Sequence, residues 1–307
     1  MNEKVSVLQV DNLSIAFSMY NRGLSKRDLE VIHELSIDVK KGEIVAVVGS
    51  SGSGKSLLAH AIMGILPENS KTKGSIKYYN DELNEKYLRK VRGKDIAFIP
   101  QSVDFLDPLM KVGKQVVGIN GNKEKQKEVF KKYNLDDKVA EMYPFQLSGG
   151  MARRVLIATA VMNEAKLIIA DEPTPGLNLE LAMETLNNFR EIADNGCGVL
   201  LITHDVDLAL NVADRIAVFY SGTIVEIAQV EDFIKGKDAL RHPYSKAFID
   251  ALPQNKFKEL PGYQPYAGNL PKGCLFRDRC SLKTDECCME IKMRKVRDGE
   301  VRCINAT

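Results

Sequence analysis

The stretch Gly49-Ser50-Ser51-Gly52-Ser53-Gly54-Lys55-Ser56 decides how the rest of this chain is interpreted. It fits the pattern G-x-x-x-x-G-K-[ST], which is typical of a phosphate-binding P-loop. The apolar run Ile44 to Val48 predicts a buried strand before the loop, and apolar residues at helical spacing from Lys55 to Ile65 predict a helix after it. In that setting the loop N–H groups would bind phosphate oxygens, Lys55 would reach the β- and γ-phosphates, and the Ser56 hydroxyl would bind Mg²⁺.

The composition bounds the remaining possibilities. The chain has 307 residues and a net charge of +2, so it gives no strong electrostatic case for nucleic acid or an anionic membrane. The first residues lack the apolar core of a signal peptide, and no apolar run approaches the roughly 20 residues that cross a bilayer. We therefore expect a cytosolic chain whose membrane role, if it has one, comes through partners.

The segment before the P-loop has the alternation of β-structure. Apolar residues recur at every second position between Val5 and Val39, on both sides of a loop from Tyr20 to Arg27. This predicts an antiparallel β layer. Phe17 or Tyr20 could stack on an adenine ring, although Phe17 fits the core equally well and Tyr20 fits an ordinary loop aromatic.

Three more apolar runs predict strands, and polar residues follow each of them. The runs and their followers are Asp95 to Ile99 with Gln101, Leu167 to Ala170 with Asp171 and Glu172, and Val199 to Thr203 with His204. Asp171 is suited to the Mg²⁺ shell of a P-loop enzyme, and Glu172 can polarise a water for attack on the γ-phosphate. His204 can hydrogen-bond that phosphate. Gln101 could touch the metal or the water, but a glutamine in a turn often has no such role.

Between these strands the pattern is mostly helical, from Ser102 to about Met162. Within it, Leu147-Ser148-Gly149-Gly150-Met151 opens a helix, with Ser148 at the N-cap position and two glycines that expose N–H groups. It predicts either a second anion site or a simple capped helix start. A hairpin around Ser221-Gly222 is predicted to close the domain. We place a boundary near residue 235, giving regions 1–235 and 236–307.

Together these motifs resemble those of the ATP-binding subunit of an ABC transporter. The matching elements, in the family's order, are the Walker A loop (Gly49 to Ser56), the Q-loop (Gln101), the signature (Leu147 to Met151), the Walker B strand (Leu167 to Glu172) and the switch histidine (His204). The resemblance implies an α/β P-loop NTPase with a RecA-like core, an antiparallel β subdomain and a helical subdomain at about 102–162. It also implies an ATPase that uses Mg²⁺. Asn178 departs from the aspartate that is usual in the D-loop, which puts the equivalence of the two ATP sites of a dimer in doubt.

The region after 235 narrows the resemblance. Three segments resemble the C-terminal extension of oligopeptide, dipeptide and nickel importer ATPases: Arg241 to Ser245, Leu260 to Pro265 and Gly273 to Cys280. Methionine in the last signature position suggests the first of the two ATPase subunits of these importers. The resemblance implies an ATPase that powers peptide uptake, with nickel or metallophore uptake as the alternative. A soluble ABC ATPase that does not serve transport and a P-loop kinase are rival interpretations.

Five of the six cysteines lie near the C-terminus. In a cytosolic chain this favours metal binding over disulfides. Four thiolates, Cys274, Cys280, Cys287 and Cys303, suit either Zn²⁺ or an iron–sulfur cluster, and reduced thiols in a small core are a third possibility. The resemblance implies a 4Fe-4S cluster on these four. Cys288 is expected to be a spare, because neighbouring side chains diverge.

The resemblance also implies partners. ATPase subunits of this family pair head to tail, so Ser148, Gly149 and Gly150 would complete the ATP site of another subunit in trans. We expect a heterodimer with a second ABC ATPase, two transmembrane permease subunits and an extracytoplasmic substrate-binding protein, at the cytoplasmic face of the membrane. The surface from Gln101 to Met110, with Phe105 and Leu106, would contact the permease, unless these two side chains belong to the core.

Overall fold

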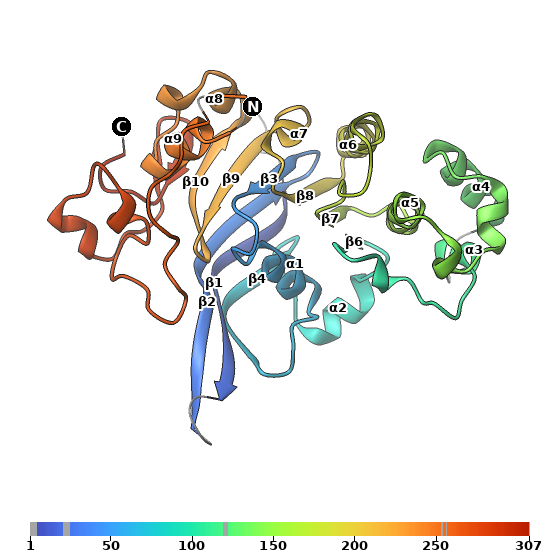
Figure 1. Ribbon diagram of the computed structural model, residues 1–307. Coiled ribbons are helices and arrows are strands. Elements are labelled where there is room, and N and C mark those ends of the chain that lie inside the picture. The colour runs from blue at the N-terminus through green and yellow to red at the C-terminus, as the bar shows by residue number, and fades with distance from the viewer. Residues whose placement is uncertain (1–4, 21–24, 119–121, 253, 256, 307) are drawn as a thin grey trace.

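Two sheets and a surrounding set of helices make up the computed structural model, which describes residues 5–20, 25–118, 122–252, 254–255 and 257–306 (Figure 1). The main sheet runs through the centre. The helices α3, α4 and α5 lie beyond its β6 edge, and the C-terminal region lies beyond the opposite edge (Figure 1). The core of the predicted loop between Tyr20 and Arg27, residues 21–24, falls outside the described residues.

The smaller sheet is antiparallel, as the alternation predicts. Its order is β2-β1-β4-β5, and its strands are β1 (Ser6–Tyr20), β2 (Lys26–Lys40), β4 (Ser70–Tyr78) and β5 (Asp81–Glu82). Strand β1 lies in the middle and pairs with β2 and with β4, so its inward side chains are covered on both sides. This sheet packs on one face of the main sheet.

The main sheet has the order β11-β12-β10-β9-β3-β8-β7-β6. Its strands are β3 (Ile44–Val48), β6 (Ile96–Ile99), β7 (Leu167–Asp171), β8 (Gly198–Thr203), β9 (Arg215–Tyr220), β10 (Thr223–Gln229), β11 (Arg294–Val296) and β12 (Gly299–Val301). The strands from β9 to β6 are all parallel, and the other pairs are antiparallel. The carboxyl ends of the parallel strands therefore meet at one edge of the sheet.

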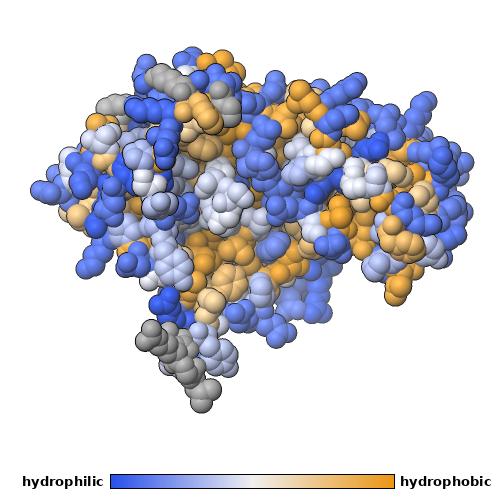
Figure 2. Space-filling model, viewed as in Figure 1, coloured by the Kyte–Doolittle hydropathy of each residue, from blue (hydrophilic) through white to orange (hydrophobic). Residues whose placement is uncertain are grey.

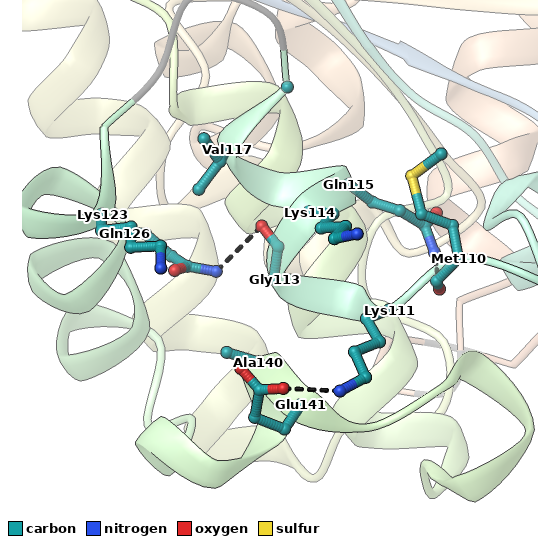
Figure 3. A pocket seen from close by; sticks show the side chains of 11 residues that line it. Met110, Lys111, Gly113, Lys114, Gln115, Val117, Lys123, Gln126, Ala140 and Glu141 are labelled. Carbon is teal, nitrogen blue, oxygen red and sulfur yellow. Dashed lines mark hydrogen bonds and ion pairs between the residues drawn. The ribbon is translucent and has the colours of Figure 1, made fainter.

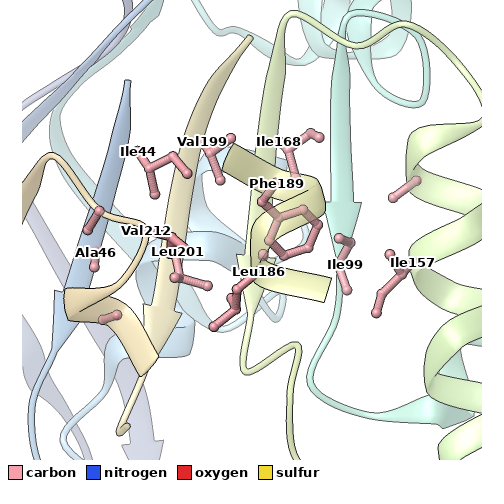
Figure 4. Close-up of a cluster of buried hydrophobic side chains, with 14 of the residues drawn as sticks. Ile44, Ala46, Ile99, Ile157, Ile168, Leu186, Phe189, Val199, Leu201 and Val212 are labelled. Atoms are coloured by element: carbon pink, nitrogen blue, oxygen red, sulfur yellow. The ribbon is translucent and has the colours of Figure 1, made fainter. Parts of the chain in front are cut away.

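The central strands are buried on both faces, which explains why their sequences are continuously apolar. In β3, Ile44, Ala46 and Val48 belong to the core on one face, while Val45 and Val47 belong to the core shared with the antiparallel sheet. The first core lies between the main sheet and the helices α5 and α6, where Leu186, Phe189 and Ile157 approach side chains of the strands (Figure 4).

Nine α-helices connect and cover the strands of the described chain. They are α1 (Lys55–Met63), α2 (Glu85–Val91), α3 (Val112–Val117), α4 (Lys123–Lys132), α5 (Gly149–Val161), α6 (Leu179–Asp194), α7 (Val206–Leu210), α8 (Val230–Ile234) and α9 (Pro243–Asp250). Helices α3 to α5 lie in the stretch for which the sequence predicts helical structure. No helix in the described ranges has the length and apolar character needed to cross a membrane.

The C-terminal region contributes two strands, β11 and β12, to the main sheet. Strand β12 pairs with β10, so the main sheet continues beyond the hairpin of β9 and β10. A buried carboxylate, Glu226 of β10, accepts hydrogen bonds from the N–H groups of Arg241 and His242, each at 2.8 Å. The Arg241 guanidinium forms an ion pair with Asp232 and donates to the carbonyl of Val296 in β11. The division near residue 235 stays a prediction, and the sheet crosses it.

Candidate functional site

The strand register brings the predicted polar residues to one edge. Val48 pairs with Thr203, and Asp171 pairs with Ile202, so three parallel strands end nearly in line. The residues that follow, Gly49 of the P-loop, Glu172 and His204, therefore leave the sheet at the same place. β6 ends beside β7 in the same register and delivers the segment that contains Gln101.

The P-loop conformation depends on its glycines. Gly52 and Gly54 have φ angles of 72° and 103°, which only glycine adopts without strain. A Cβ on Gly49 would lie 2.5 Å from the carbonyl oxygen of Phe219 in β9. The first glycine therefore allows the loop to leave the sheet beside β9, and the other two allow the left-handed backbone turns of the loop.

Lys55 is buried at the base of this loop. Its ammonium donates to the carbonyl oxygens of Gly49 and Ser50, both at 2.9 Å. A lysine has three donors, so one remains for a phosphate oxygen. Burial lowers the pKa of Lys55, while the charges of Glu172 and Asp171 act in the opposite direction and favour the ammonium form.

Asp171 carries an unsatisfied buried carboxylate. The residue is 1% exposed, and neither oxygen has a hydrogen-bond partner within ordinary limits among the described residues. Burial, and next the charge of Glu172, raise its pKa, while the nearby Ser56 hydroxyl lowers it. A buried carboxylate beside a hydroxyl and one further carboxylate fits a divalent cation, whose preferred ligands are oxygens. The residues present therefore fit Mg²⁺ at Ser56 and Asp171.

Glu172 and His204 form a pair at the mouth of the site. The Glu172 Oε2 and His204 Nδ1 atoms lie 2.7 Å apart. Glu172 is buried and has a φ of 49°, an uncommon value for a residue other than glycine, and its N–H donates to the carbonyl of Ile202. The His204 side chain is 58% exposed. The left-handed backbone at Glu172 and its hydrogen bond to Ile202 thus fix the position of this carboxylate. The exposed His204 ring contacts it at the surface.

Gln101 is exposed, and a residue that the sequence did not indicate holds its backbone. The buried guanidinium of Arg153, in α5, donates to the carbonyl oxygens of Pro100 and Gln101. Arg153 stands shortly after the signature glycines, so this contact joins the start of α5 to the segment after β6. No pattern in the sequence distinguishes Arg153 from the adjacent Arg154, which binds the carbonyls of Gly150, Tyr133 and Asn134 instead.

The predicted signature lies apart from this edge. Ser148 caps α5 and accepts from the Met151 N–H at 3.3 Å. Gly150 faces Gly176 and Leu177 in the loop before α6, and α5 packs beside β6 at the edge of the sheet (Figure 1). The structure thus brings together Gly49 to Ser56, Asp171, Glu172 and His204, and it does not bring Ser148 to Gly150 into that group.

Comparison with known proteins agrees with this geometry. The family profile described as "ABC transporter" matches residues 32–175, and that described as "Oligopeptide/dipeptide transporter, C-terminal region" matches residues 225–287. The dipeptide transport ATP-binding protein DppD of Escherichia coli is 33% identical over 92% of this chain and 91% of its own length. The oligopeptide transport ATP-binding protein OppD of Bacillus subtilis is 34% identical over 90% of this chain and 81% of its own.

The chain belongs to the ABC transporter ATPases. A dimeric bacterial ABC transporter cassette superposes with a TM-score of 0.65 at 26% identity, covering 73% of this chain and 98% of the cassette. A nucleotide-free ATP-binding cassette gives a TM-score of 0.60 at 24% identity, covering 75% and 94%. The predicted family, the ABC cassette fold and the ATPase activity are confirmed. The roles of the individual site residues stay predictions.

Two aromatic residues were candidates for binding adenine in this ABC ATPase. Phe17 is partly buried and packs against the core between the sheets, whereas Tyr20, at the end of β1, is 69% exposed. The Lys26 ammonium lies 5.1 Å from the centre of the Tyr20 ring. The Tyr20 ring is thus the more exposed of the two, and the role of either ring in binding adenine stays a prediction.

Asn178 keeps a structural task of the residue that it replaces. It is the N-cap of α6, and its side-chain oxygen accepts from the Leu181 N–H at 2.9 Å. Aspartate and asparagine are about equally good N-caps. The replacement therefore changes the charge of this loop and not its local fold.

The cysteines of the ABC ATPase gather in the C-terminal region. The Cys280 and Cys287 sulfurs accept from backbone N–H groups of Leu282 and Thr284, at 3.4 and 3.5 Å. Burial raises the pKa of Cys303 to about 11, with a smaller contribution in the same direction from the charges of the other three predicted ligands. Cys287 is buried, whereas Cys288 is exposed and its sulfur accepts from the Arg277 guanidinium, and which of the two is a ligand stays a prediction. In the described chain, no set of three or more His, Cys, Asp or Glu side chains is arranged to hold one metal ion.

The structure separates the two apolar residues that were named for the surface predicted to meet a permease. Leu106 is buried in the helical region and is no surface residue, because the short turn of Val103–Phe105 directs it inward. Phe105 is exposed, as are Leu109 and Met110 within the predicted stretch and Phe145 outside it. Figure 2 shows apolar side chains reaching the surface over this end of the molecule, on the right.

A cavity of about 720 Å³ opens next to this surface, between α3, α4 and the turn at Asp137–Glu141. Figure 3 shows its wall held by a hydrogen bond from Gln126 to the Gly113 carbonyl and by the ion pair of Lys111 with Glu141. A Cβ on Gly113 would lie 2.8 Å from Ala140, so this glycine allows the close approach of α3 to the turn. The helical end of the molecule thus presents exposed apolar residues beside a cavity.

Proposed function

We propose that this ABC ATPase powers peptide import as one half of a dimer of ATPase subunits. The observation that carries the proposal is the separation of two half-sites: the P-loop, Asp171, Glu172 and His204 share one edge, while the exposed signature at Ser148 lies elsewhere on the chain. A complete ATP site then needs the signature of another subunit. Relatives named for dipeptide and oligopeptide transport support peptides as cargo over nickel or a metallophore.

Each residue of the edge receives a role. The P-loop N–H groups and Lys55 hold the β- and γ-phosphates, and Tyr20 stacks on the adenine. Ser56 and Asp171 would hold Mg²⁺, which would supply positive charge to offset the negative charge of the transferred phosphoryl group. Glu172 accepts a proton from the attacking water. His204, which lies 2.7 Å from Glu172, and Gln101 orient that water and the γ-phosphate.

The proposed partners follow from the two exposed regions. A second ABC ATPase subunit supplies the signature in trans, and Asn178 makes the two ATP sites of this heterodimer differ in charge. Two permease subunits are proposed to dock on the exposed apolar surface of Phe105, Leu109, Met110 and Phe145, with the chain at the cytoplasmic face of the membrane. A substrate-binding protein delivers the peptide to the permease on the other side.

Reconstitution tests this function. The chain would be assembled in lipid nanodiscs with the permease, second ATPase and substrate-binding protein encoded by neighbouring genes. We expect ATP hydrolysis to rise when the binding protein carries a peptide, and to stay at the basal rate with nickel or a metallophore. Stimulation by the metal and not by peptides would contradict the peptide assignment, and assembly without any stimulation would contradict the import function.

We also propose that Cys274, Cys280, Cys287 and Cys303 hold a 4Fe-4S cluster. The support is their shared neighbourhood, together with the N–H···S hydrogen bonds at Cys280 and Cys287, which are a means of tuning such clusters. Zinc on the same four thiolates is the alternative.

Anaerobic purification decides this point. Iron and acid-labile sulfide in a four-to-four ratio per chain, with a brown colour, are expected. Cys280→Ser should lose the colour, while Cys288→Ser should keep it. Colourless protein with one zinc per chain would establish the alternative metal, and colourless protein without metal would leave reduced thiols.

A further inference from the structure

A segment of the C-terminal region crosses to the P-loop. We call residues Leu260 to Pro265 the strap. At its far end, the Ser50 hydroxyl of the P-loop donates to the Gln264 side-chain oxygen at 3.1 Å. The neighbouring Pro265 carbonyl accepts from the Ser221 hydroxyl at 3.5 Å, in the turn between β9 and β10. The strap thus touches the loop that is proposed to bind the phosphates, from a part of the sequence 214 residues away.

The near end of the strap is held by one arginine. Arg279 donates to the carbonyl oxygens of Pro261 and Leu260, at 2.8 and 3.0 Å. Its guanidinium also reaches the Tyr220 hydroxyl at 3.4 Å and lies over the Phe276 ring. Arg279 is the residue before Cys280, so one hydrogen-bonded route leads from the cysteine region through Arg279 and the strap to Ser50.

The contact at Ser50 bears on the shape of the P-loop. The Ser50 carbonyl accepts from Lys55, and its hydroxyl donates to Gln264, so the residue is fixed from inside the loop and from outside. The loop is otherwise rich in glycine and would sample many conformations before binding phosphate. A loop that is held in its binding conformation pays less conformational entropy when the ligand arrives.

We propose that the strap is a positioning element for the P-loop, and that Gln264 raises nucleotide affinity by fixing Ser50. This inference rests on the proposed role of the P-loop in binding ATP. The strap makes the C-terminal region a determinant of nucleotide binding, through Arg279 at one end and Gln264 at the other. Gln264 acts through Ser50 and does not itself take part in hydrolysis.

A double-mutant cycle on the full chain tests the contact. The dissociation constant of MgADP would be measured by titration calorimetry for the wild type, Gln264→Ala, Ser50→Ala and the double variant. We expect each single variant to weaken binding about 2- to 10-fold, the range for loss of one hydrogen bond, and the double variant to be no weaker than either. Tyr263→Ala is the matched control, since that adjacent side chain is 96% exposed and should leave the affinity unchanged.

The outcomes separate this inference from the proposed function. Wild-type chain that fails to bind MgADP would overturn the proposed function itself. Wild-type binding with unchanged affinity in Gln264→Ala, with additive effects in the double variant, or with tighter binding in Gln264→Ala would overturn the strap's positioning role alone.

A second measurement examines the Arg279 end. In the assembled transporter, Arg279→Met should raise the KM for MgATP by a similar factor and leave kcat at saturating ATP unchanged. A variant that is merely less stable would lose kcat through loss of active protein, so the separation of KM from kcat identifies positioning. If Arg279→Met does not fold, the Gln264→Ala variant decides through the same two constants, and an unchanged KM there would overturn the proposal.

Discussion

Two buried carboxylates, Asp171 and Glu226, stand in opposite circumstances. Asp171 is 1% exposed, and within the described residues its oxygens have no hydrogen-bond partner of ordinary geometry. Glu226 is fully buried and accepts from two backbone N–H groups while it faces the Arg241 guanidinium. Both lie on strands of the same sheet, Asp171 at the carboxyl end of β7 and Glu226 within β10.

The difference shows how one sheet serves two purposes. An unsatisfied buried charge costs free energy and persists where a ligand completes it, whereas a satisfied one fixes a structure. The edge around Asp171 is thus prepared for Mg²⁺ and nucleotide. The network around Glu226 attaches the C-terminal region to the sheet. Substitutions around Asp171 should change ATP hydrolysis and leave the free energy of unfolding nearly unchanged. Substitutions around Glu226 should lower the free energy of unfolding and leave the chemistry of hydrolysis unchanged.

The largest expected effect is on chemistry at the functional edge. Glu172→Gln should bind MgATP like the wild type but hydrolyse it about 10²- to 10⁴-fold more slowly, because the water loses its proton acceptor. Steady-state phosphate release and nucleotide binding by the assembled transporter would measure both. Glu191→Gln, which breaks an exposed ion pair with Lys132, is the control that should keep full activity. Undiminished hydrolysis in Glu172→Gln would refute its role.

A large effect on stability is expected at the other carboxylate. Glu226→Gln leaves Arg241 buried with Asp232 as its remaining acidic partner, and breaking a buried pair of this kind costs about 3–5 kcal/mol. The midpoint of chemical denaturation should fall accordingly. Glu34→Gln removes an ion pair with Arg302 that is half exposed, so it should cost about 0–1 kcal/mol. Equal losses of unfolding free energy in Glu226→Gln and Glu34→Gln would contradict the structural role given to Glu226.

The same network predicts a pH dependence. Burial lowers the pKa of His242 to about 3, while an unfolded histidine titrates near pH 6.5. Below pH 6.5, His242 of the unfolded chain therefore binds a proton that it does not bind in the native chain. The free energy of unfolding consequently falls as the pH falls towards 3. At pH 5 this amounts to about 2 kcal/mol relative to pH 7 and above. His242→Gln should show a flatter profile of unfolding free energy between pH 7 and 5, and an unchanged slope would contradict the assignment.

The smallest effect is expected at Asn178. Asn178→Asp keeps the N-cap of α6 and should change the free energy of unfolding by less than about 0.5 kcal/mol, whereas Asn178→Ala should lose about 1 kcal/mol. Thermal unfolding measures both. A change in ATP hydrolysis by Asn178→Asp without a change in stability would show that the charge of this loop matters for the dimer and not for the fold.

The parts of the molecule that follow from the sequence are those with local patterns. The P-loop and its flanking strand and helix are a contiguous signal, and β7 and β8 are apolar runs that end in polar residues. Alternate burial of β3 on two faces explains why its five residues are all apolar. The gathering of Glu172 and His204 could be expected because parallel strands end at one edge.

The remaining parts depend on contacts between distant segments. Gln264 reaches Ser50 across 214 residues, and no periodicity marks either partner. Strands β11 and β12 are three residues each, too short to show an alternating pattern. Phe105 and Leu106 are adjacent and both apolar, and a single short turn decides which one is exposed. Such outcomes are set by packing, which composition and spacing do not encode.

The pairing of β12 with β10 has a consequence for how the chain is made. Seventy residues separate the end of β10 at Gln229 from Gly299 at the start of β12. At synthesis rates of about 5–20 residues per second, the open hydrogen-bonding side of β10 waits roughly 4 to 14 seconds for its neighbour. During that interval it is a bare strand edge, able to pair with other chains. The two strands that complete this end of the sheet, β12 and β11, are thus made long after β10 itself.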